Sequence, residues 1–293
     1  MAATHRSPFD REIGVRTGDG RTTTIGITGE RSDAAPVVLL HGLSQQRAFW
    51  GPVIRRLRHR PVIAVDQRGH GASDATVTDD FAIARVARDL AEILDGLGVT
   101  GAHLVGHSWG AAVALRASVQ DAERTRSTAL IDGGLWTSPT TMSPREEVMA
   151  RLRPPDLGLT ADALWDRIRA GDLGATWSSE TRAALEPTFI ADDAGLLRTR
   201  IGVDRHLAVL SALLDYDPWP DAAAVRTPMW FAMCTPRGGL EDPLRRQTLE
   251  RAARLPAVLV QQWEGAVHDV PLQWPALVAG FIDALVESAE GAR

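Results

Sequence analysis

The sequence predicts an α/β fold in which helices flank a mostly parallel β-sheet. Short uninterrupted apolar runs, such as residues 36–40 and 61–65, suit strands that are buried on both faces of a parallel sheet. These runs alternate with helical patterns, and that alternation indicates βαβ units. A G-x-S-x-G motif at residues 106–110 follows a strand pattern and precedes a helical one, which is a third sign of strand–turn–helix units.

The first 131 residues contain six predicted strands. Residues 10–17 and 21–28 form an expected hairpin, because Asp19-Gly20 between them favours a tight turn. The four later strands are residues 36–40, 61–65, 102–105 and 127–131. The helices expected among them are residues 50–58, 79–97 and 111–117, and the second of these carries apolar residues at three- and four-residue steps.

The rhythm of the sequence changes after the sixth strand. Between residues 135 and 225 strand patterns give way to helical patterns broken by prolines. We expect this segment to form an all-helical cap over the carboxyl edge of the sheet, where open α/β folds place their sites. Strands return at 228–233 and 257–263, followed by helices near 243–254 and 274–287. The predicted core therefore comprises residues 1–134 and 226–293, and the predicted cap residues 135–225.

The G-x-S-x-G motif has the sequence context of a nucleophile elbow. An apolar run precedes it and a run of good helix formers follows it. Gly106 and Gly110 are expected for steric reasons, because a sharp strand-to-helix turn leaves no room for side chains. The N-terminus of the following helix favours negative charge beside Ser108. We therefore identify Ser108 as the candidate nucleophile.

Four motifs in a fixed order carry a family resemblance. They are His41-Gly42, the run D-Q-R-G-H-G-A-S-D at 66–74, the elbow at 106–110, and G-A-V-H-D-V-P at 265–271. With them the chain resembles the α/β-hydrolase fold superfamily, in its capped, cofactor-free branch. The resemblance spans roughly residues 10–290 and implies a hydrolase, but it names no substrate because this fold hosts many chemistries.

The resemblance implies the chain order Ser, acid, His for the catalytic residues. Only His206 and His268 follow Ser108 in the sequence. His268 is the expected base, because a loop between the last strand and the last helix can reach the elbow. His206 lies in the predicted cap and is interpreted as a surface or cap-core residue.

Two carboxylates are candidates for the acid that orients His268. Most of the family carry it in the loop after the strand that follows the cap, where the first acids here are Glu241 and Asp242. Asp242 lies eight residues beyond Cys234, which is late for a carboxylate at a strand end. Asp132 directly ends the preceding strand, where some capped members carry their acid, although a turn-forming role is common for Asp. We favour Asp132, with Asp242 as runner-up.

An oxyanion hole requires two backbone N–H groups directed at the developing alkoxide. Trp109, the residue after the nucleophile, is expected to supply one of them. Leu43, in the loop after the third strand, is expected to supply the other. The resemblance implies that His41 helps to shape this loop.

Tryptophans concentrate around the predicted site. Trp136, Trp165, Trp177 and Trp219 fall in or at the edges of the cap, and Trp50 and Trp109 fall beside the oxyanion loops. Core packing is the usual role of a buried Trp, but such a cap also predicts an aromatic-lined pocket. We expect Trp50, Trp136 and Trp165 to line the substrate pocket, so that the acyl or alcohol part of the substrate is apolar.

Composition limits the class of protein. The 293 residues are 44% hydrophobic and 24% charged, and the net charge of −5 with both signs interspersed gives no indication of nucleic-acid or membrane binding. The single cysteine, Cys234, excludes an internal disulfide, and neither a signal-peptide pattern nor a membrane-span pattern is visible. We expect a cytoplasmic protein with a small-molecule substrate. No metal or cofactor is expected, because neither a cluster of metal ligands nor a phosphate loop is visible.

The sequence thus predicts a serine hydrolase that acts on a carboxylic ester, lactone or thioester. Ser at the elbow argues against haloalkane dehalogenases and epoxide hydrolases, which resemble this family but use Asp there. Carbon–carbon bond hydrolysis, amide hydrolysis and perhydrolase activity remain alternatives because they share the triad. A weakly catalytic ligand-binding protein is a further alternative, although the candidate nucleophile, base and acid are all present.

Overall fold

The computed structural model describes residues 7–29, 34–58, 60–76, 78–136, 140, 143–154, 157–236 and 242–291. The strands are β1 (Arg11–Arg16), β2 (Thr22–Thr28), β3 (Val37–Leu40), β4 (Val62–Val65), β5 (Ala102–His107), β6 (Thr125–Ile131), β7 (Phe189–Ala191), β8 (Leu197–Thr199), β9 (Met229–Thr235) and β10 (Val258–Glu264). The α-helices are α1 (Gly51–Ile54), α2 (Ile83–Gly96), α3 (Trp109–Gln120), α4 (Arg145–Arg151), α5 (Ala161–Ala170), α6 (Ser179–Leu185), α7 (Val203–Leu214), α8 (Trp219–Ala224), α9 (Pro243–Ala252), α10 (Val270–Gln273) and α11 (Pro275–Gly291). The 3-10 helices are η1 (Arg47–Trp50), η3 (Gly174–Thr176) and η4 (Glu186–Thr188).

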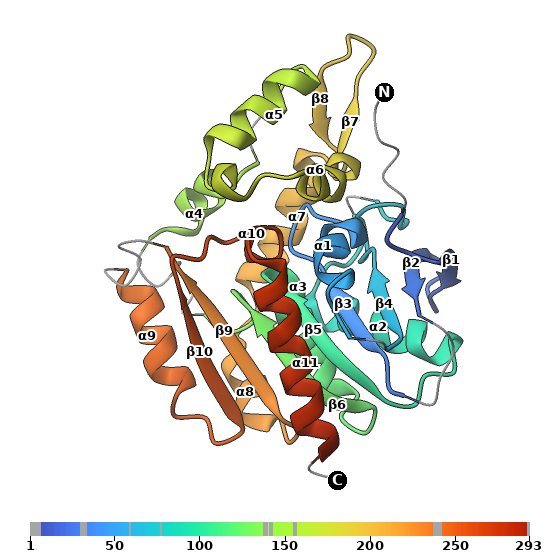
Figure 1. The fold of residues 1–293 in the computed structure, drawn as a ribbon, viewed down its shortest axis with the longest axis vertical. Coiled ribbons are helices and arrows are strands. Elements are labelled where there is room, and N and C mark those ends of the chain that lie inside the picture. Colours follow the sequence, from blue (N-terminus) through green and yellow to red (C-terminus); the bar gives the residue numbers. More distant parts are fainter. Residues whose placement is uncertain are drawn as a thin grey trace.

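Eight of the described strands form one sheet in the order β1-β2-β4-β3-β5-β6-β9-β10 (Figure 1). β2 pairs antiparallel with both β1 and β4, whereas every pair from β4 to β10 is parallel. β3 and β5 are buried along their whole length, because helices cover both faces of the sheet. The predicted fold class, a mostly parallel sheet flanked by helices, is confirmed.

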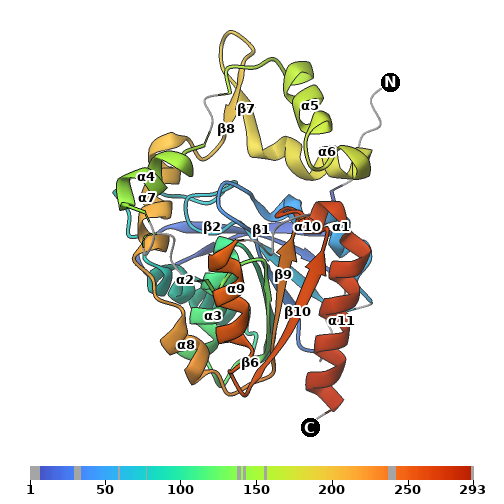
Figure 2. The ribbon, with the colours of Figure 1, turned by 90° about the vertical axis from the view of Figure 1, so that its left-hand side faces the viewer.

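The side chains of each strand alternate between two apolar cores, one on each face of the sheet. In β3, Val38 and Leu40 pack with α2 and α3, whereas Val37 and Leu39 pack with α1 and α11. Figure 2 shows α2, α3, α8 and α9 on one side of the sheet and α1 and α11 on the other. The carboxyl ends of the parallel strands are left for the loops that carry the site.

The chain between β6 and β9, called the insert here (residues 135–225), carries α4 to α8 and the hairpin of β7 and β8. In Figures 1 and 2, α5 and the hairpin lie beyond one end of the sheet. α8 instead packs against α3 beside the sheet, and its Trp219 is buried in the same core as α3. The last helix of the insert therefore belongs to the layer that flanks the sheet.

The expectation of an all-helical insertion was wrong in one detail. β7 and β8 are three residues each and pair antiparallel, with Phe189 opposite Thr199. Gly195 in the turn between them has a φ of 76°, which glycine adopts easily. Strands this short carry no readable alternation of apolar and polar residues, since that pattern needs four or more residues.

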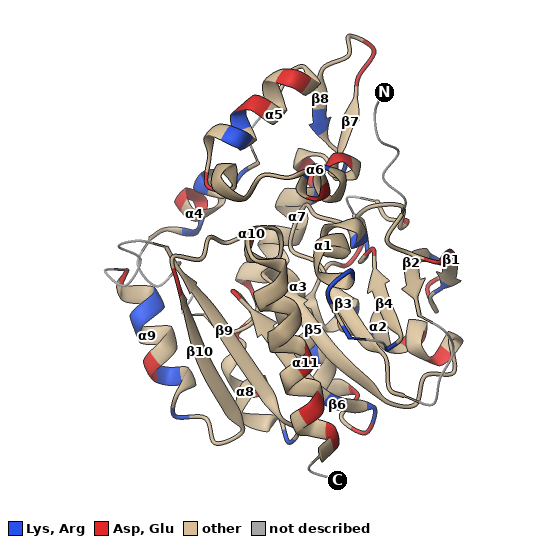
Figure 3. Cartoon of the chain, viewed as in Figure 1, with Lys and Arg blue, Asp and Glu red and all other residues tan. Residues whose placement is uncertain are grey.

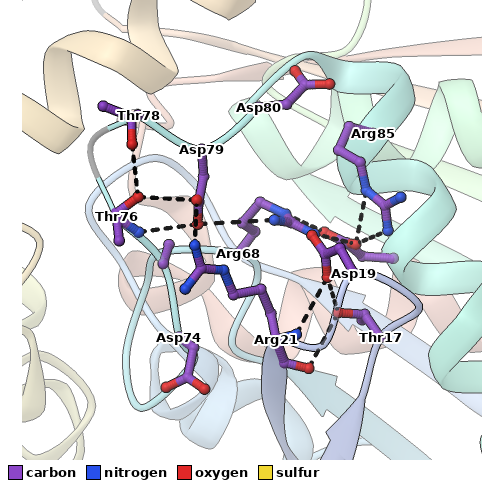
Figure 4. A network of polar contacts seen from close by, with 12 residues as sticks. Thr17, Asp19, Arg21, Arg68, Asp74, Thr76, Thr78, Asp79, Asp80 and Arg85 are labelled. Atoms are coloured by element: carbon purple, nitrogen blue, oxygen red, sulfur yellow. Dashed lines mark hydrogen bonds and ion pairs between the residues drawn. The ribbon is translucent and has the colours of Figure 1, made fainter.

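A buried guanidinium connects three separated segments on the face covered by α2 (Figure 4). Arg68, which follows β4 and is 4% exposed, lies 2.6 Å from Asp89 of α2 and 2.6 Å from Asp19 of the β1–β2 turn. Asp79 lies 3.9 Å from the same guanidinium. These contacts fix the loop after β4, and with it one side of the carboxyl edge of the sheet.

Charged residues of both signs are distributed over the elements of the molecule (Figure 3). α5 and α9, for example, each carry acidic and basic residues. Within the described ranges, none of the helices combines the length and the apolar character needed to cross a membrane.

Candidate active site

Ser108 lies at the sharp turn between β5 and α3. Its backbone has φ 54° and ψ −119°, and its N–H donates to the carbonyl of Ile131 at 2.9 Å. A Cβ on Gly106 would lie 2.2 Å from the carbonyl oxygen of Gly110, and a Cβ on Gly110 would lie 2.3 Å from the carbonyl oxygen of Leu40. The two glycines are therefore required sterically, as the motif indicated, and the turn presents the serine at the end of β5.

An unbroken hydrogen-bond chain links three of the predicted residues. His268 Nδ1 lies 2.6 Å from Asp132 Oδ2, and His268 Nε2 lies 3.0 Å from Ser108 Oγ. A carboxylate only accepts, so Nδ1 carries the proton and Nε2 is free to accept from the serine hydroxyl. The other Asp132 oxygen, Oδ1, accepts from the backbone N–H of Cys234 at 2.9 Å.

Strand ends bring these three residues together from distant parts of the chain. Ser108 follows β5, Asp132 follows β6, and His268 lies in the turn after β10. Asp132 has a φ of 45° and a side chain that is only 7% exposed, whereas the side chain of His268 is 54% exposed. The carboxylate is thus fixed inside the protein and the imidazole faces the open side of the site.

The structure places Asp242 away from His268. Asp242 is the N-cap of α9, where its Oδ1 accepts from the backbone N–H of Leu244 at 2.9 Å. Its Oδ2 lies 3.6 Å from Nε of Arg245, whose Nη1 lies 3.9 Å from Asp132. Glu241 lies outside the described residues. The runner-up acid therefore reaches the site only indirectly, through a cation behind Asp132.

Electrostatics favours an ionised acid and a basic imidazole. Burial alone would raise the pKa of Asp132, but the hydrogen bond and charge of His268 lower that pKa below its usual value. Desolvation alone would lower the pKa of His268, but the hydrogen bond and charge of Asp132 outweigh it and raise the pKa. His268 is the one histidine in the described part of the chain whose pKa is resolved as raised.

Buried neutral histidines surround the site. Burial lowers the pKa of His70 to about 4 and that of His107 to about 3. His41 is fully buried; its Nδ1 donates to the Gly42 carbonyl at 2.8 Å, and its Nε2 accepts from the Gln67 N–H at 3.1 Å. His41 thus joins the loop after β4 to the loop after β3, which is the loop expected to carry an oxyanion donor.

The loop after β3 passes directly over the elbow. A Cβ on Gly42 would lie only 3.2 Å from the Ser108 Cβ. The next residue, Leu43, donates no backbone hydrogen bond within the described residues. Trp109 is the first residue of α3, and first-turn N–H groups have no partner inside a helix. Both predicted oxyanion donors therefore lie on segments adjacent to Ser108.

The predicted pocket tryptophans have different environments. Trp136 is half-buried and meets Tyr216 edge-on at 5.9 Å between ring centroids. Trp165 is 3% exposed and packs inside the insert against Trp177, with centroids 6.0 Å apart. Trp50 has no exposed surface and packs in the core below the loop, so the expectation that it lines the pocket is not supported by its position.

Sequence reasoning did not indicate the partners of two histidines that support the site, His107 and His206. His107 Nε2 donates to the backbone carbonyl of His268 at 2.8 Å, and thereby supports the loop that carries the imidazole. His206 is buried on α7 of the insert, which agrees with the expected cap-core position, and it also contacts Ser44 of the loop after β3 at 2.7 Å. His107 could be singled out because it lies inside the motif, but no pattern indicates the partner of either histidine.

Two observations bear on other ligands. No group of three or more His, Cys, Asp or Glu residues able to hold a metal occurs among the residues with described positions. A cavity of about 390 Å³ lies near Pro36, Pro61 and Gly101, at the opposite ends of the strands from Ser108. This cavity is lined by none of the predicted site residues.

Comparison with known proteins places the chain among hydrolases. A family model described as "alpha/beta hydrolase fold" matches residues 35–213. A protein of Variovorax paradoxus (strain S110) named "Putative carbamate hydrolase RutD" is 39% identical over 117 residues, which are 39% of this chain and 43% of that protein. The protein of the same name from Caulobacter sp. (strain K31) is 30% identical over 212 residues, which are 69% of this chain and 72% of that protein.

Among solved structures, E-2-(acetamidomethylene)succinate hydrolase superposes with a TM-score of 0.74 at 24% identity, covering 94% of this chain and 99% of that chain. At this identity the likeness shows the fold alone. The aligned part of the chain spans less than half of the Variovorax relative and nearly three quarters of the Caulobacter relative.

Proposed function

The chain belongs to the α/β-hydrolase fold family, and from that premise we propose that it is a serine hydrolase that cleaves a carboxylic ester, lactone or thioester of a fairly apolar small molecule. The observation that carries the proposal is the hydrogen-bond chain from Asp132 through His268 to Ser108. In this proposal Ser108 is the nucleophile, His268 the general base and Asp132 the acid.

The reaction proceeds through an acyl-enzyme. Ser108 Oγ attacks the substrate carbonyl while its proton passes to His268 Nε2, and the resulting oxyanion accepts hydrogen bonds from the N–H groups of Leu43 and Trp109. The tetrahedral intermediate collapses, and His268 returns the proton to the leaving alcohol or thiol. A water then attacks the acyl carbonyl while His268 takes its proton, and His268 gives that proton to Ser108 Oγ as the second tetrahedral intermediate collapses to the free acid and free Ser108.

The insert (residues 135–225) is proposed to act as a cap over this site. Support comes from α5 and the β7–β8 hairpin, which lie beyond the end of the sheet in Figure 1. Of the tryptophans, Trp136 remains the better candidate for a pocket wall, since it is half-buried and follows the Asp132 loop. Trp165 would contribute by packing the insert rather than by exposed contact.

Cleavage of a C–N bond is the second candidate function. The name shared by the two relatives, putative carbamate hydrolase, favours it. The same triad would serve, because His268 can protonate an amine leaving group as it does an alcohol. Hydrolysis rates of an ester, a carbamate and an amide with matched apolar groups distinguish the candidates: faster turnover of the carbamate than of the ester would favour the second.

Labelling with a fluorophosphonate probe tests the proposed triad without a guess about the substrate. Intact mass should show one adduct on the wild type, none on Ser108→Ala and strongly slowed labelling on His268→Ala. The reason is that an unactivated serine is a poor nucleophile at neutral pH. A folded wild-type protein that forms no adduct would contradict the proposal and favour a ligand-binding protein.

A further inference from the structure

The loop between β3 and η1 (residues 41–46), which carries Leu43, is called the oxyanion loop here. Three of its consecutive side chains contact the insert. Ser44 Oγ lies 2.7 Å from His206 Nδ1 on α7. Gln45 Oε1 accepts from the hydroxyl of Thr188 in η4 at 3.3 Å. Gln46 Nε2 donates to the backbone carbonyl of Ala184 in α6 at 3.4 Å. Three elements of the insert therefore meet the loop that carries Leu43.

The direction of the shortest of these bonds follows from the second nitrogen of the imidazole. His206 Nε2 lies 3.0 Å from the backbone carbonyl of Leu152, which can only accept, so Nε2 carries a proton. Burial lowers the pKa of His206, which keeps the ring neutral. Nδ1 is then an acceptor, and the hydroxyl of Ser44 donates to it.

Ser44 needs this support because its backbone is strained. Its φ is 68°, and the other two non-glycine residues with positive φ in the described part of the chain are Ser108 and Asp132. The N–H of Gln45 donates to the carbonyl of Gly42 at 3.1 Å, so Ser44 is the third residue of a β-turn. A positive φ at that place is typical of a type II turn, which favours glycine.

We propose that Ser44 and His206 form a clasp that keeps this turn strained, and thereby keeps the Leu43 N–H directed at the oxyanion, only while α7 is docked. The proposal rests on the proposed function, because it makes Leu43 an oxyanion donor. Ser44 and His206 are positioning residues in it, since they are proposed to act through the N–H of Leu43. A turn released from the clasp would relax and displace Leu43, which links the position of the insert to catalysis.

Arg205 provides a matched control on the same helix. Its Nη1 and Nη2 donate to the carbonyls of Gly69 and Ala75, each at 3.1 Å. Arg205 therefore also ties α7 to the core, but at the loop after β4 and not at the oxyanion loop. Arg205→Ala loosens the insert without touching the clasp.

The test compares kcat and KM for a p-nitrophenyl ester in the full-length chain. Ser44→Ala and His206→Leu should lower kcat about tenfold at nearly constant KM, a part of the 10²–10³-fold cost of losing an oxyanion donor. His206→Asn keeps an acceptor near the Nδ1 position and should recover most of the rate. Ser44→Gly should also stay close to wild type, because glycine adopts the positive φ without a clasp.

Amide hydrogen exchange provides a readout that does not depend on activity. Exchange in a peptide covering residues 41–50 should accelerate in Ser44→Ala and His206→Leu and stay unchanged in Arg205→Ala. Equal effects of all three substitutions on kcat and on exchange, or Ser44→Gly as slow as Ser44→Ala, would overturn the clasp. If the wild type labels at Ser108 but Ser44→Ala and His206→Leu change neither kcat nor exchange, the clasp is wrong and the proposed function stands. If the wild type neither reacts with the fluorophosphonate probe nor hydrolyses the ester, the proposed function is wrong. Hydrogen exchange in His206→Leu then still shows whether the order of the loop depends on His206.

Discussion

Ser108 and Asp132 both have backbone angles that L-residues rarely adopt, with φ of 54° and 45°. Each costs about 1–3 kcal/mol relative to an ordinary conformation, so the surrounding structure must hold it. The N–H of Ser108 donates to Ile131 and the N–H of Asp132 donates to Ala232, which fixes both residues to neighbouring strands. The strain directs the two side chains toward His268 before any substrate is bound.

Substitution of the two candidate acids distinguishes their roles. Asp132→Asn should lower kcat by about 10⁴, because an amide can no longer hold the His268 tautomer that accepts the Ser108 proton. Asp242→Asn should leave kcat nearly unchanged and cost little stability, since Asn caps a helix about as well as Asp. Steady-state kinetics of the two variants on one ester provides the measurement. A loss of activity in Asp242→Asn that matches Asp132→Asn would assign the acid to residue 242 instead.

At the scale of elements, strands such as β3, β4 and β9 were predictable because each contains an apolar run of four or more residues, whereas β1 and β2 were predictable from the turn signal Asp19-Gly20 between them. Predicted strand 36–40, for example, appears as Val37–Leu40, and 257–263 appears as Val258–Glu264. The β7–β8 hairpin was not predictable, since three-residue strands carry no periodicity. The placement of Ser108 could be read from its motif, because the steric need for two glycines is local.

The turn between β5 and α3 allows a sharp test of that steric argument. Gly106→Ala would place a methyl group 2.2 Å from the Gly110 carbonyl oxygen, which the backbone can relieve only by moving. We expect a loss of about 1–3 kcal/mol of stability or more, and a loss of activity because Ser108 shifts. Gly280→Ala on the exposed side of α11 meets nothing within 4 Å and should stabilise by about 0.5–1 kcal/mol.

Urea unfolding of both variants, with hydrolysis of an ester as a second readout, provides the measurement. Gly280→Ala is the control: it shows the general effect of replacing glycine by alanine in a place without steric conflict, and the remainder in Gly106→Ala is the effect of the turn. A Gly106→Ala protein with wild-type stability and rate would mean that the elbow does not need glycine at this position.

At the scale of the whole molecule, contacts between distant segments decide what the sequence left open. Ser44 and His206 are 162 positions apart, and His107 and the carbonyl of His268 are 161 apart. No local pattern marks such pairs, because each member reads as an ordinary polar residue. The same limitation left Asp132 and Asp242 as alternatives, because no local pattern shows that β6 and β9 pair side by side.

Buried histidines should make the stability of the molecule depend on pH. Five of them have a lowered pKa: His41, His70, His103, His107 and His206. The folded state keeps these rings neutral, whereas the unfolded chain takes up protons below its ordinary histidine pKa of about 6.5. Their stabilising contribution is therefore complete above that pH and is lost as the pH falls toward the folded-state pKa values.

The pKa values of His70 and His107 set the expected size of this effect. With pKa values of about 4 for His70 and about 3 for His107, each should cost about 2 kcal/mol of stability between pH 6.5 and pH 5. His268 acts in the opposite sense, because its raised pKa stabilises the fold at low pH and loses that effect as the pH rises through it. That loss falls mainly above pH 6.5, outside the range from pH 6.5 to pH 5 in which His70 and His107 act.

Urea unfolding monitored by tryptophan fluorescence at pH 7, 6 and 5 measures this dependence. The free energy of unfolding should fall by several kcal/mol over that range, about 4 kcal/mol from His70 and His107 together. His70→Gln removes one titrating ring and should reduce the slope below pH 6.5 by close to one proton, whatever its effect on stability at pH 7. A slope that is the same in His70→Gln and in the wild type would mean that His70 binds as many protons folded as unfolded, and that its neutral surroundings in the folded protein are wrong.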